Sequence, residues 1–397
     1  MPVLRYLTAG ESHGPMLVAI LEGLPAGVPV CQEAIDARLR QRQAGPGRGG
    51  RQRIERDHAE LVAGVRAGET LGGPVGVLVR NRDWENWQGV LGADGVDPER
   101  AEAKALYRPR PGHADLAGAL KYDRRDLRDV LERASARETA ARVAVGALCI
   151  ELLEAVGIRV LGHVLALGPV EARPVPADMD LAALHAAVAA SDCRCWDPEA
   201  TAQMHEAVRQ ATLARDTLGG RIEVRAVGVP PGLGSYAASD RRLDGRLAGA
   251  LMSIQAMKAV EVGIGLAAAA LPGSAVHDEI VTGPPAPDAY SRYVRPSNRA
   301  GGLEGGVTNG EPVVLRVAMK PIPTLLRPLR SADMRTGEVI TAGYERSDIT
   351  SVPAASVVAE AVTAFVLAQA VLEKFGGDSL RELRRNFEGY RAQVLER

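Results

Sequence analysis

The strongest constraint on the fold is a long apolar segment near the C-terminus, Val352 to Leu372, which only Glu360 and Gln369 interrupt. Pro353 suits the first turn of a helix, and the pair Gly376 and Gly377 suits its end. A helix that is apolar nearly all the way round needs cover on more than one side. The polar interruptions argue against a membrane span. We therefore expect a buried core helix of a soluble protein.

Two further segments have the same character, which gives three predicted helices: Ala134 to Val156, Arg246 to Val262, and Ala354 to Phe375. Strand-like runs surround them, namely MLVAILEGL, GVLVRN, RVLGHVLALG, RIEVRAVGV and EPVVLRVAM. Aromatic residues make up only 4% of the chain, which favours an aliphatic core with closely packed helices. The pattern predicts sheets packed on a central helical layer.

The organisation of the chain favours one domain over residues 1–397. The polar, proline-rich stretches Glu171 to Ala177 and Gly283 to Arg295 are expected to be loops, and neither has the composition of a flexible linker. The runs MLVAILEGLPAG and RIEVRAVGVPPG resemble each other. This similarity leaves open an internal duplication, although glycine and proline residues of ordinary turns alone produce such matches.

Charge and cysteine content narrow the class of protein. The 48 basic and 49 acidic residues give a net charge of −1, so no overall field favours nucleic acid or an anionic membrane. Four cysteines are too few for a disulfide framework, which suits a reducing compartment. Cys193 and Cys195 have no second Cys or His pair at zinc-finger spacing, so we expect free thiols and no metal. No apolar signal peptide opens the chain, and we expect a cytoplasmic location.

A glycine-bounded histidine follows the first strand candidate, in GESHG (Gly10 to Gly14). The glycines let the backbone adopt positive φ and let a ligand approach, while Ser12 and His13 supply a hydroxyl and a titratable imidazole. The same pattern also fits an ordinary turn. A second histidine, His113, lies in RPRPGHAD, where two prolines restrict the backbone and Arg108 and Arg110 add cations.

Arginines cluster between Arg38 and Arg56, around AGPGRGGR. Guanidinium groups bind phosphate and carboxylate in a bidentate way, so several could converge on one multiply charged ligand. RNA is a rival ligand, weakened because no aromatic residue interleaves the arginines for base stacking. A solvated basic loop is the plain alternative.

Later segments add further candidate contacts. The stretch ERASARETA (Glu132 to Ala140) places Arg133 and Arg137 near the start of a buried helix, where free amides favour phosphate, although Ser135 could simply cap the helix. The glycine-rich SNRAGGLEGGVTNG, the stretch KPIPT (Lys320 to Thr324) and the RSD that ends at Asp348 supply amides, a cation, a hydroxyl and a carboxylate.

Taken in order, GESHG, the arginine loop, RPGHAD, RASARET, SNRAGGLEGG, KPIPT and RSD resemble the chorismate synthase family from about Arg5 to Phe375. The resemblance implies a β-α-β sandwich in which two antiparallel sheets flank helices, and a homotetramer. It also implies conversion of 5-enolpyruvylshikimate 3-phosphate to chorismate by 1,4-anti elimination of phosphate, with reduced FMN. The chain would then be a lyase of aromatic amino acid biosynthesis.

The resemblance also implies roles for individual residues. His13 matches the histidine that protonates the leaving phosphate, His113 the one beside the reduced flavin, and Asp348 the carboxylate that helps flavin nitrogen 5 take up the ring proton. The matching anion-binding arginines are Arg42, Arg48, Arg51, Arg110 and Arg137. The matching FMN positions are Arg133, Ala134, Ser135, Gln255, Ala256, Gly305, Lys320, Pro321, Ile322, Pro323, Thr324 and Arg346.

At some positions the sequence differs from the family pattern, and for some functions the resemblance leaves alternatives. Ala134 stands where many members have serine, Arg299 where some have histidine, and Ser347 where others have histidine. The family also links Arg42 and Arg48 to NADPH. No added segment suggests an intrinsic flavin reductase, so reduced flavin is expected from a separate enzyme. A non-catalytic protein that binds FMN, phosphate or RNA remains the alternative.

Overall fold

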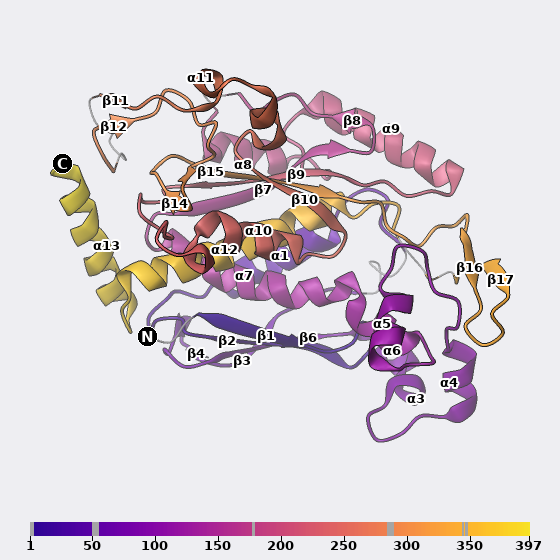
Figure 1. The fold of residues 1–397 in the computed structure, drawn as a ribbon. Helices are drawn as coiled ribbons and strands as arrows, with labels where there is room; N and C mark the ends of the chain where they lie inside the picture. Colours follow the sequence, from indigo (N-terminus) through magenta and orange to yellow (C-terminus); the bar gives the residue numbers. More distant parts are fainter. Residues whose placement is uncertain (1–3, 50–54, 177–178, 284–289, 344, 346–347) are drawn as a thin grey trace.

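Two antiparallel sheets lie on opposite sides of a layer of helices in the computed structural model of the chain (Figure 1). The structure describes residues 4–49, 55–176, 179–283, 290–343, 345 and 348–397. The four-stranded sheet has the order β1-β2-β6-β3, and the five-stranded sheet has the order β10-β15-β9-β7-β8. The predicted α+β sandwich is therefore confirmed.

The four-stranded sheet is built from the N-terminal part of the chain. Its strands are β1 (Arg5–Ala9), β2 (Met16–Glu22), β6 (Val75–Arg80) and β3 (Glu60–Ala63). Side chains alternate between the two faces with a period of two. Leu17, Ala19 and Leu21 of β2 are buried against the helices, whereas Ile20 faces outward and is 49% exposed. One face of this sheet therefore belongs to the core and the other does not.

The five-stranded sheet comes from later segments. Its strands are β10 (Met257–Val262), β15 (Val313–Met319), β9 (Gly220–Val227), β7 (Arg159–Leu167) and β8 (Val170–Glu171). In the central strand β9, Ile222, Val224 and Ala226 are buried. All five strand-like runs of the sequence are strands, as expected from their β-branched alternation.

The layer between the sheets contains α1 (Gln32–Gln43), α7 (Thr139–Glu154), α10 (Leu243–Met252) and α12 (Val352–Phe375). Helix α12 is long and apolar enough to cross a membrane by composition, but 83% of its most apolar window is buried in the fold. It is the core helix that the sequence predicts. Where α7 crosses α12, a Cβ on Gly146 would lie only 2.4 Å from the Cβ of Ala361, so glycine permits the close contact.

The predicted helix Arg246 to Val262 is wrong in its second half. Helix α10 ends at Met252, and Met257–Val262 is strand β10, which pairs with β15. Ala256 separates the two with a left-handed φ of 68°, which a continuing helix cannot accommodate. The predicted helix from Ala134 begins later, at Thr139, after a 3₁₀ turn at Ala136–Glu138.

The two runs that resemble each other are β2 and β9, which are interior strands of opposite sheets. The sheets differ in strand number, so internal duplication stays a prediction.

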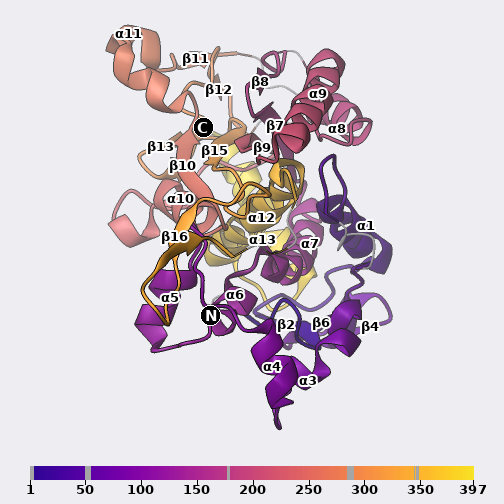
Figure 2. The same ribbon diagram turned by 90° about the vertical axis from the view of Figure 1, so that its right-hand side faces the viewer.

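Shorter elements gather at the ends of the sandwich. Figure 2 looks onto the end where α5, α6 and the β16–β17 hairpin lie. The remaining elements are β4 (Val65–Arg66), β5 (Glu69–Thr70), α3 (Gln88–Leu91), α4 (Pro98–Lys104), α5 (Asp115–Tyr122), α6 (Arg128–Ala134), α8 (Leu181–Ala189), α9 (Pro198–Ala214), α11 (Gly273–Val276), β11 (Val281–Thr282), β12 (Tyr293–Val294), β13 (Leu303–Glu304), β14 (Val307–Thr308), β16 (Arg330–Ala332), β17 (Val339–Thr341) and α13 (Leu380–Leu395).

Candidate active site

His13 lies in the turn between β1 and β2 and is held by a buried carboxylate. A Cβ on Gly10, whose φ is 108°, would lie 2.3 Å from the main-chain oxygen of Met16, so this tight turn requires glycine. The Nδ1 atom of His13 is 2.9 Å from Oε1 of Glu132, and its main-chain amide donates to Oε2 at 2.8 Å. The imidazole also stacks on Trp87, with ring centroids 4.1 Å apart.

Glu132 itself is only 1% exposed. Burial would raise the pKa of Glu132, but the hydrogen bonds from His13 and the charge of Arg128 outweigh it and lower the pKa. The ionised carboxylate therefore fixes the orientation of the imidazole.

His113 has an equivalent arrangement in the turn that precedes α5. Its Nδ1 atom lies 2.5 Å from Oδ1 of Asp115, and Arg110 binds the same carboxylate through Nε at 2.8 Å and Nη2 at 3.0 Å. Burial would raise the pKa of Asp115, but the hydrogen bonds from His113 and Arg110 hold it well below its usual range. Arg110 also donates to Thr324 Oγ1 at 2.9 Å, which joins this turn to KPIPT.

Arg42 and Arg137 share one buried carboxylate, Asp57. Nη1 of Arg137 lies 2.5 Å from Oδ1, and Nη1 of Arg42 lies 3.4 Å from Oδ2. Burial lowers the pKa of Arg42 to about 10, and the charges of Arg137 and Arg48 add to this effect, although Asp57 opposes it. Nη2 of Arg137 is buried without a hydrogen bond among the described residues, and it lies 3.8 Å from Oε2 of Glu55, a second buried carboxylate.

Arg48 pairs with Asp348. Its Nη1 atom donates to Oδ2 of the carboxylate at 2.6 Å, and the amide of Gly49 donates to Oδ1 at the same distance. The next residue, Ile349, donates its amide to the main-chain oxygen of Gly47 at 2.7 Å. The arginine loop and the segment before α12 are thus joined by side chains and main chain together.

The segment 343–348 connects all three groups. The amide of Gly343 donates to the main-chain oxygen of Arg108, before the His113 turn. Glu345 accepts from Arg128 at 2.8 Å, and Arg128 also binds Glu132, the partner of His13. With Asp348 bound to Arg48, one short segment reaches the surroundings of both histidines and the arginine loop.

A cavity of about 400 Å³ lies along the edge strand β1, beside the His13 turn. It is lined by Tyr6, Leu7, Thr8, Arg133, Glu138, Arg142 and Gln255. The buried Oε1 of Gln255 has no hydrogen-bond partner among the residues that the structure describes. The lining combines the guanidiniums of Arg133 and Arg142 with the carboxylate of Glu138. Arg133 donates to Thr8 and Gly10, and Arg142 pairs with Glu138.

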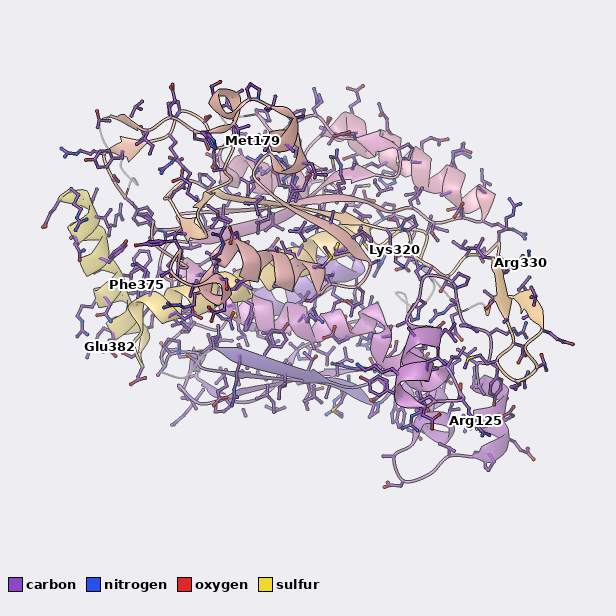
Figure 3. The ribbon with its side chains drawn as sticks, in the orientation of Figure 1. Arg125, Met179, Lys320, Arg330, Phe375 and Glu382 are labelled. Carbon is purple, nitrogen blue, oxygen red and sulfur yellow. The ribbon has the colours of Figure 1, made fainter. Side chains whose placement is uncertain are left out.

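KPIPT lies on the turn that bears His113. The side chain of Lys320, which is labelled in Figure 3, donates to the main-chain oxygen of Gly112. The main-chain amide of Lys320 donates to the oxygen of Ala256, the residue after Gln255. Burial and the charge of Lys258 lower the pKa of Lys320. These contacts place the Lys320–Thr324 stretch between the His113 turn and the residue that follows the cavity wall.

Comparison with known proteins agrees with this geometry. The family model described as "Chorismate synthase" matches residues 4–372. The chain is 57% identical to the chorismate synthase of Symbiobacterium thermophilum, over 99% of this chain and all of that protein, and 55% identical to that of Trichlorobacter lovleyi over the same shares. A crystal structure of a chorismate synthase matches with a TM-score of 0.78 and 42% identity, and each chain is covered in full.

The chain belongs to the chorismate synthase family. Chorismate synthases are carbon–oxygen lyases of the shikimate pathway, which makes aromatic amino acids. They eliminate phosphate from 5-enolpyruvylshikimate 3-phosphate to give chorismate and require reduced FMN. The alternative of a non-catalytic binding protein is not favoured.

Most chorismate synthase positions expected from the sequence lie in the connected groups described above. Arg133 and Gln255 line the cavity, and Ser135, next to Ala134, accepts from the amide of Arg137 and caps the 3₁₀ turn. Gly305 is separate: its β13–β14 turn lies at the opposite end of the molecule from α5 and α6 (Figure 1). Arg51, Arg346 and Ser347 lie outside the described residues.

A second cavity, of about 410 Å³, contains Arg299 but none of the expected catalytic or cofactor positions.

Sequence reasoning did not identify the carboxylates that hold the site. Glu132, Asp115 and Asp57 each orient a candidate histidine or a pair of arginines. Asp115 is two residues from His113, so its proximity was a usable signal. Glu132 is 119 residues from His13, and only folding brings these two side chains together.

Proposed function

We propose that His13 and His113 transfer protons in the chorismate synthase reaction, each oriented by a buried carboxylate. The observation that carries this proposal is the pair of contacts from Nδ1 to Glu132 and to Asp115. A carboxylate on Nδ1 fixes the ring and stabilises the imidazolium form. General acid–base catalysis of this kind contributes about 10²- to 10⁴-fold, so positioning and the cofactor must supply the remainder.

The elimination requires a proton to leave the substrate ring and a phosphate to depart. We propose that His13 donates the proton that the phosphate accepts and that His113 acts beside the flavin. When bound, reduced flavin supplies electron density to the departing allylic phosphate. The carboxylate of Asp348 would assist movement of the ring proton toward flavin nitrogen 5, and its contact with Arg48 orients it for this role.

The substrate carries one phosphate and two carboxylates, and we propose that arginines bind them. Arg48 is the best placed donor, because its pair with Asp348 is only partly buried, whereas Arg42, Arg110 and Arg137 bind carboxylates that are almost fully buried. Arg51 remains in this proposal on the resemblance alone. Arg42 fits the suggested NADPH contact less well than Arg48, since its guanidinium also donates to Thr139 and to main-chain oxygens.

The cofactor contacts remain a proposal on the same basis. We propose that FMN occupies the cavity lined by Arg133 and Gln255 and extends toward the Lys320–Thr324 stretch. Reduced flavin would come from a separate reductase. Incubating the protein anaerobically with NADPH and FMN tests this: the flavin absorbance should persist, and bleaching without added reductase would contradict it.

Assembly, domain organisation and location complete the proposal. We propose a homotetramer, supported by apolar side chains on the outer face of the four-stranded sheet, where Leu7 is 77% and Val62 is 58% exposed. One continuous core cluster runs from Leu4 to Phe387, which supports a single domain. The four free cysteines support a cytoplasmic location.

Single-turnover kinetics with prereduced FMN test the catalytic assignment. His13→Ala and His113→Ala should each slow chorismate formation by at least 100-fold while changing FMN affinity little, because both groups move protons. Wild-type rates in either variant would remove that histidine from the mechanism.

A further inference from the structure

Three side chains of the types that bind metal ions lie close together away from the proposed active site, where the loop between α8 and α9 meets α9. They are Asp192, Cys193 and His205, whose ligand atoms all lie within 4.8 Å of one another. Oδ1 of Asp192 is 2.8 Å from Nε2 of His205. The spacing of Cys193 and Cys195 alone gave no hint of this group, because its imidazole comes from the following helix.

Hydrogen bonds hold the loop that carries Asp192 and Cys193 against the helix that carries His205. Ser191 bonds to Thr201 through their hydroxyls at 3.0 Å, and Thr201 and His205 are four residues apart in α9, on the same helix face. On the other side of Cys193, the buried Arg194 binds Ser356 at 2.7 Å. The loop is therefore fixed next to the very face of α9 that carries the imidazole.

The chemistry of the trio suits a borderline metal ion. Thiolate, imidazole and carboxylate are the ligand types of zinc, with bonds of about 2.0–2.3 Å, and three protein ligands leave a fourth position for water. Ligand atoms within 4.8 Å need side-chain shifts of only about an ångström to reach a tetrahedral arrangement.

The surroundings also allow the site to bind a cation. Arg209, one turn after His205, is paired with Glu206 at 2.7 and 2.8 Å, so its charge is compensated. Asp192 and His205 are exposed, whereas Cys193 is buried beneath them.

We propose that Asp192, Cys193 and His205 form a binding site for a divalent transition-metal ion of the zinc type, with water as the fourth ligand. The main-chain oxygen of Asp192 would lie 3.5 Å from a Cβ on Gly45, so the site backs onto the arginine loop. It is distinct from the cavity proposed for FMN.

Titration of the full chain with Co²⁺ tests the site, because a thiolate ligand gives a near-ultraviolet charge-transfer band and a tetrahedral site gives strong visible bands. We expect one equivalent of Co²⁺ to produce both bands and Zn²⁺ to abolish them. Cys193→Ser should remove the charge-transfer band, and Cys31→Ser, which changes the exposed thiol, should leave it intact.

Two surface variants cover the case in which a change at buried Cys193 disturbs folding. Asp192→Asn and His205→Ala should each weaken Co²⁺ binding at least tenfold while the circular dichroism spectrum stays that of the wild type. Absence of both bands in the wild type would overturn the proposal. So would a charge-transfer band that disappears in Cys31→Ser and survives in Cys193→Ser, since that result identifies adventitious binding at the surface thiol.

Discussion

The substitution Glu132→Gln isolates the electrostatic contribution of the carboxylate behind His13. Glutamine keeps the volume of this buried side chain and removes its charge, and Arg128 keeps its contact with Glu345. A hydrogen bond to a charged group contributes about 1.5–3 kcal/mol. The charged imidazole should lose that stabilisation, which corresponds to a roughly 10- to 100-fold slower proton transfer.

The expected result follows directly from the proposed role of His13 as proton donor. The single-turnover rate with prereduced FMN should fall about 10- to 100-fold at pH 7. FMN affinity should change little.

A matched control comes from the other buried Glu–His pair. Glu223 lies 3.3 Å from Nε2 of His163 in the five-stranded sheet, and neither residue is among the expected site positions. Glu223→Gln should cost stability without lowering the single-turnover rate at pH 7. A Glu132→Gln enzyme that keeps at least half the wild-type rate at pH 7 would refute the reasoning.

Three further outcomes are expected. Asp57→Asn leaves two guanidiniums buried beside a neutral amide, so the free energy of unfolding in urea should fall by about 3–5 kcal/mol; a loss under about 1 kcal/mol would contradict this. Burial opposes ionisation of Glu223, but the hydrogen bond from His163 prevails and lowers the folded-state pKa of Glu223 from 4.5 to about 2. The ionised carboxylate therefore contributes about 3 kcal/mol of stability above pH 4.5, and this contribution is lost as the pH falls toward 2. Glu223→Gln should flatten that acid dependence of stability. Arg48→Ala should raise KM about 10- to 100-fold with a smaller change in kcat, and an unchanged KM would leave Arg48 only the structural task of binding Asp348.

Secondary structure could be predicted from the sequence wherever one physical pattern dominated. Alternating β-branched residues predicted β7, β9 and β15, and uniform apolarity predicted α12. The pattern failed after Met252, because the short edge strand Met257–Val262 has apolar residues at positions that fit a helix as well as a strand. The left-handed conformation of Ala256 has no sequence signature, because alanine favours helix.

The residues of the candidate site also fall into those that the sequence indicates and those that only the fold reveals. Motifs singled out the histidines, arginines and Asp348 as candidates, and the resemblance to the chorismate synthases implied their roles. Their partners Glu132 and Asp57 belong to no such pattern, and each reaches its contact only through tertiary packing. The same reason hid His205 from a search of cysteine spacing. Long-range pairing of buried charges is a property of the folded chain and not of any local segment.

The glycine at position 146 has a consequence far from its own surroundings. With hydrogen in place of a methyl group, α7 and α12 touch almost backbone to backbone. That contact fixes the distance between two helices of the layer that separates the sheets. A larger side chain at this crossing should therefore displace the helices and, with them, the sheets that they support.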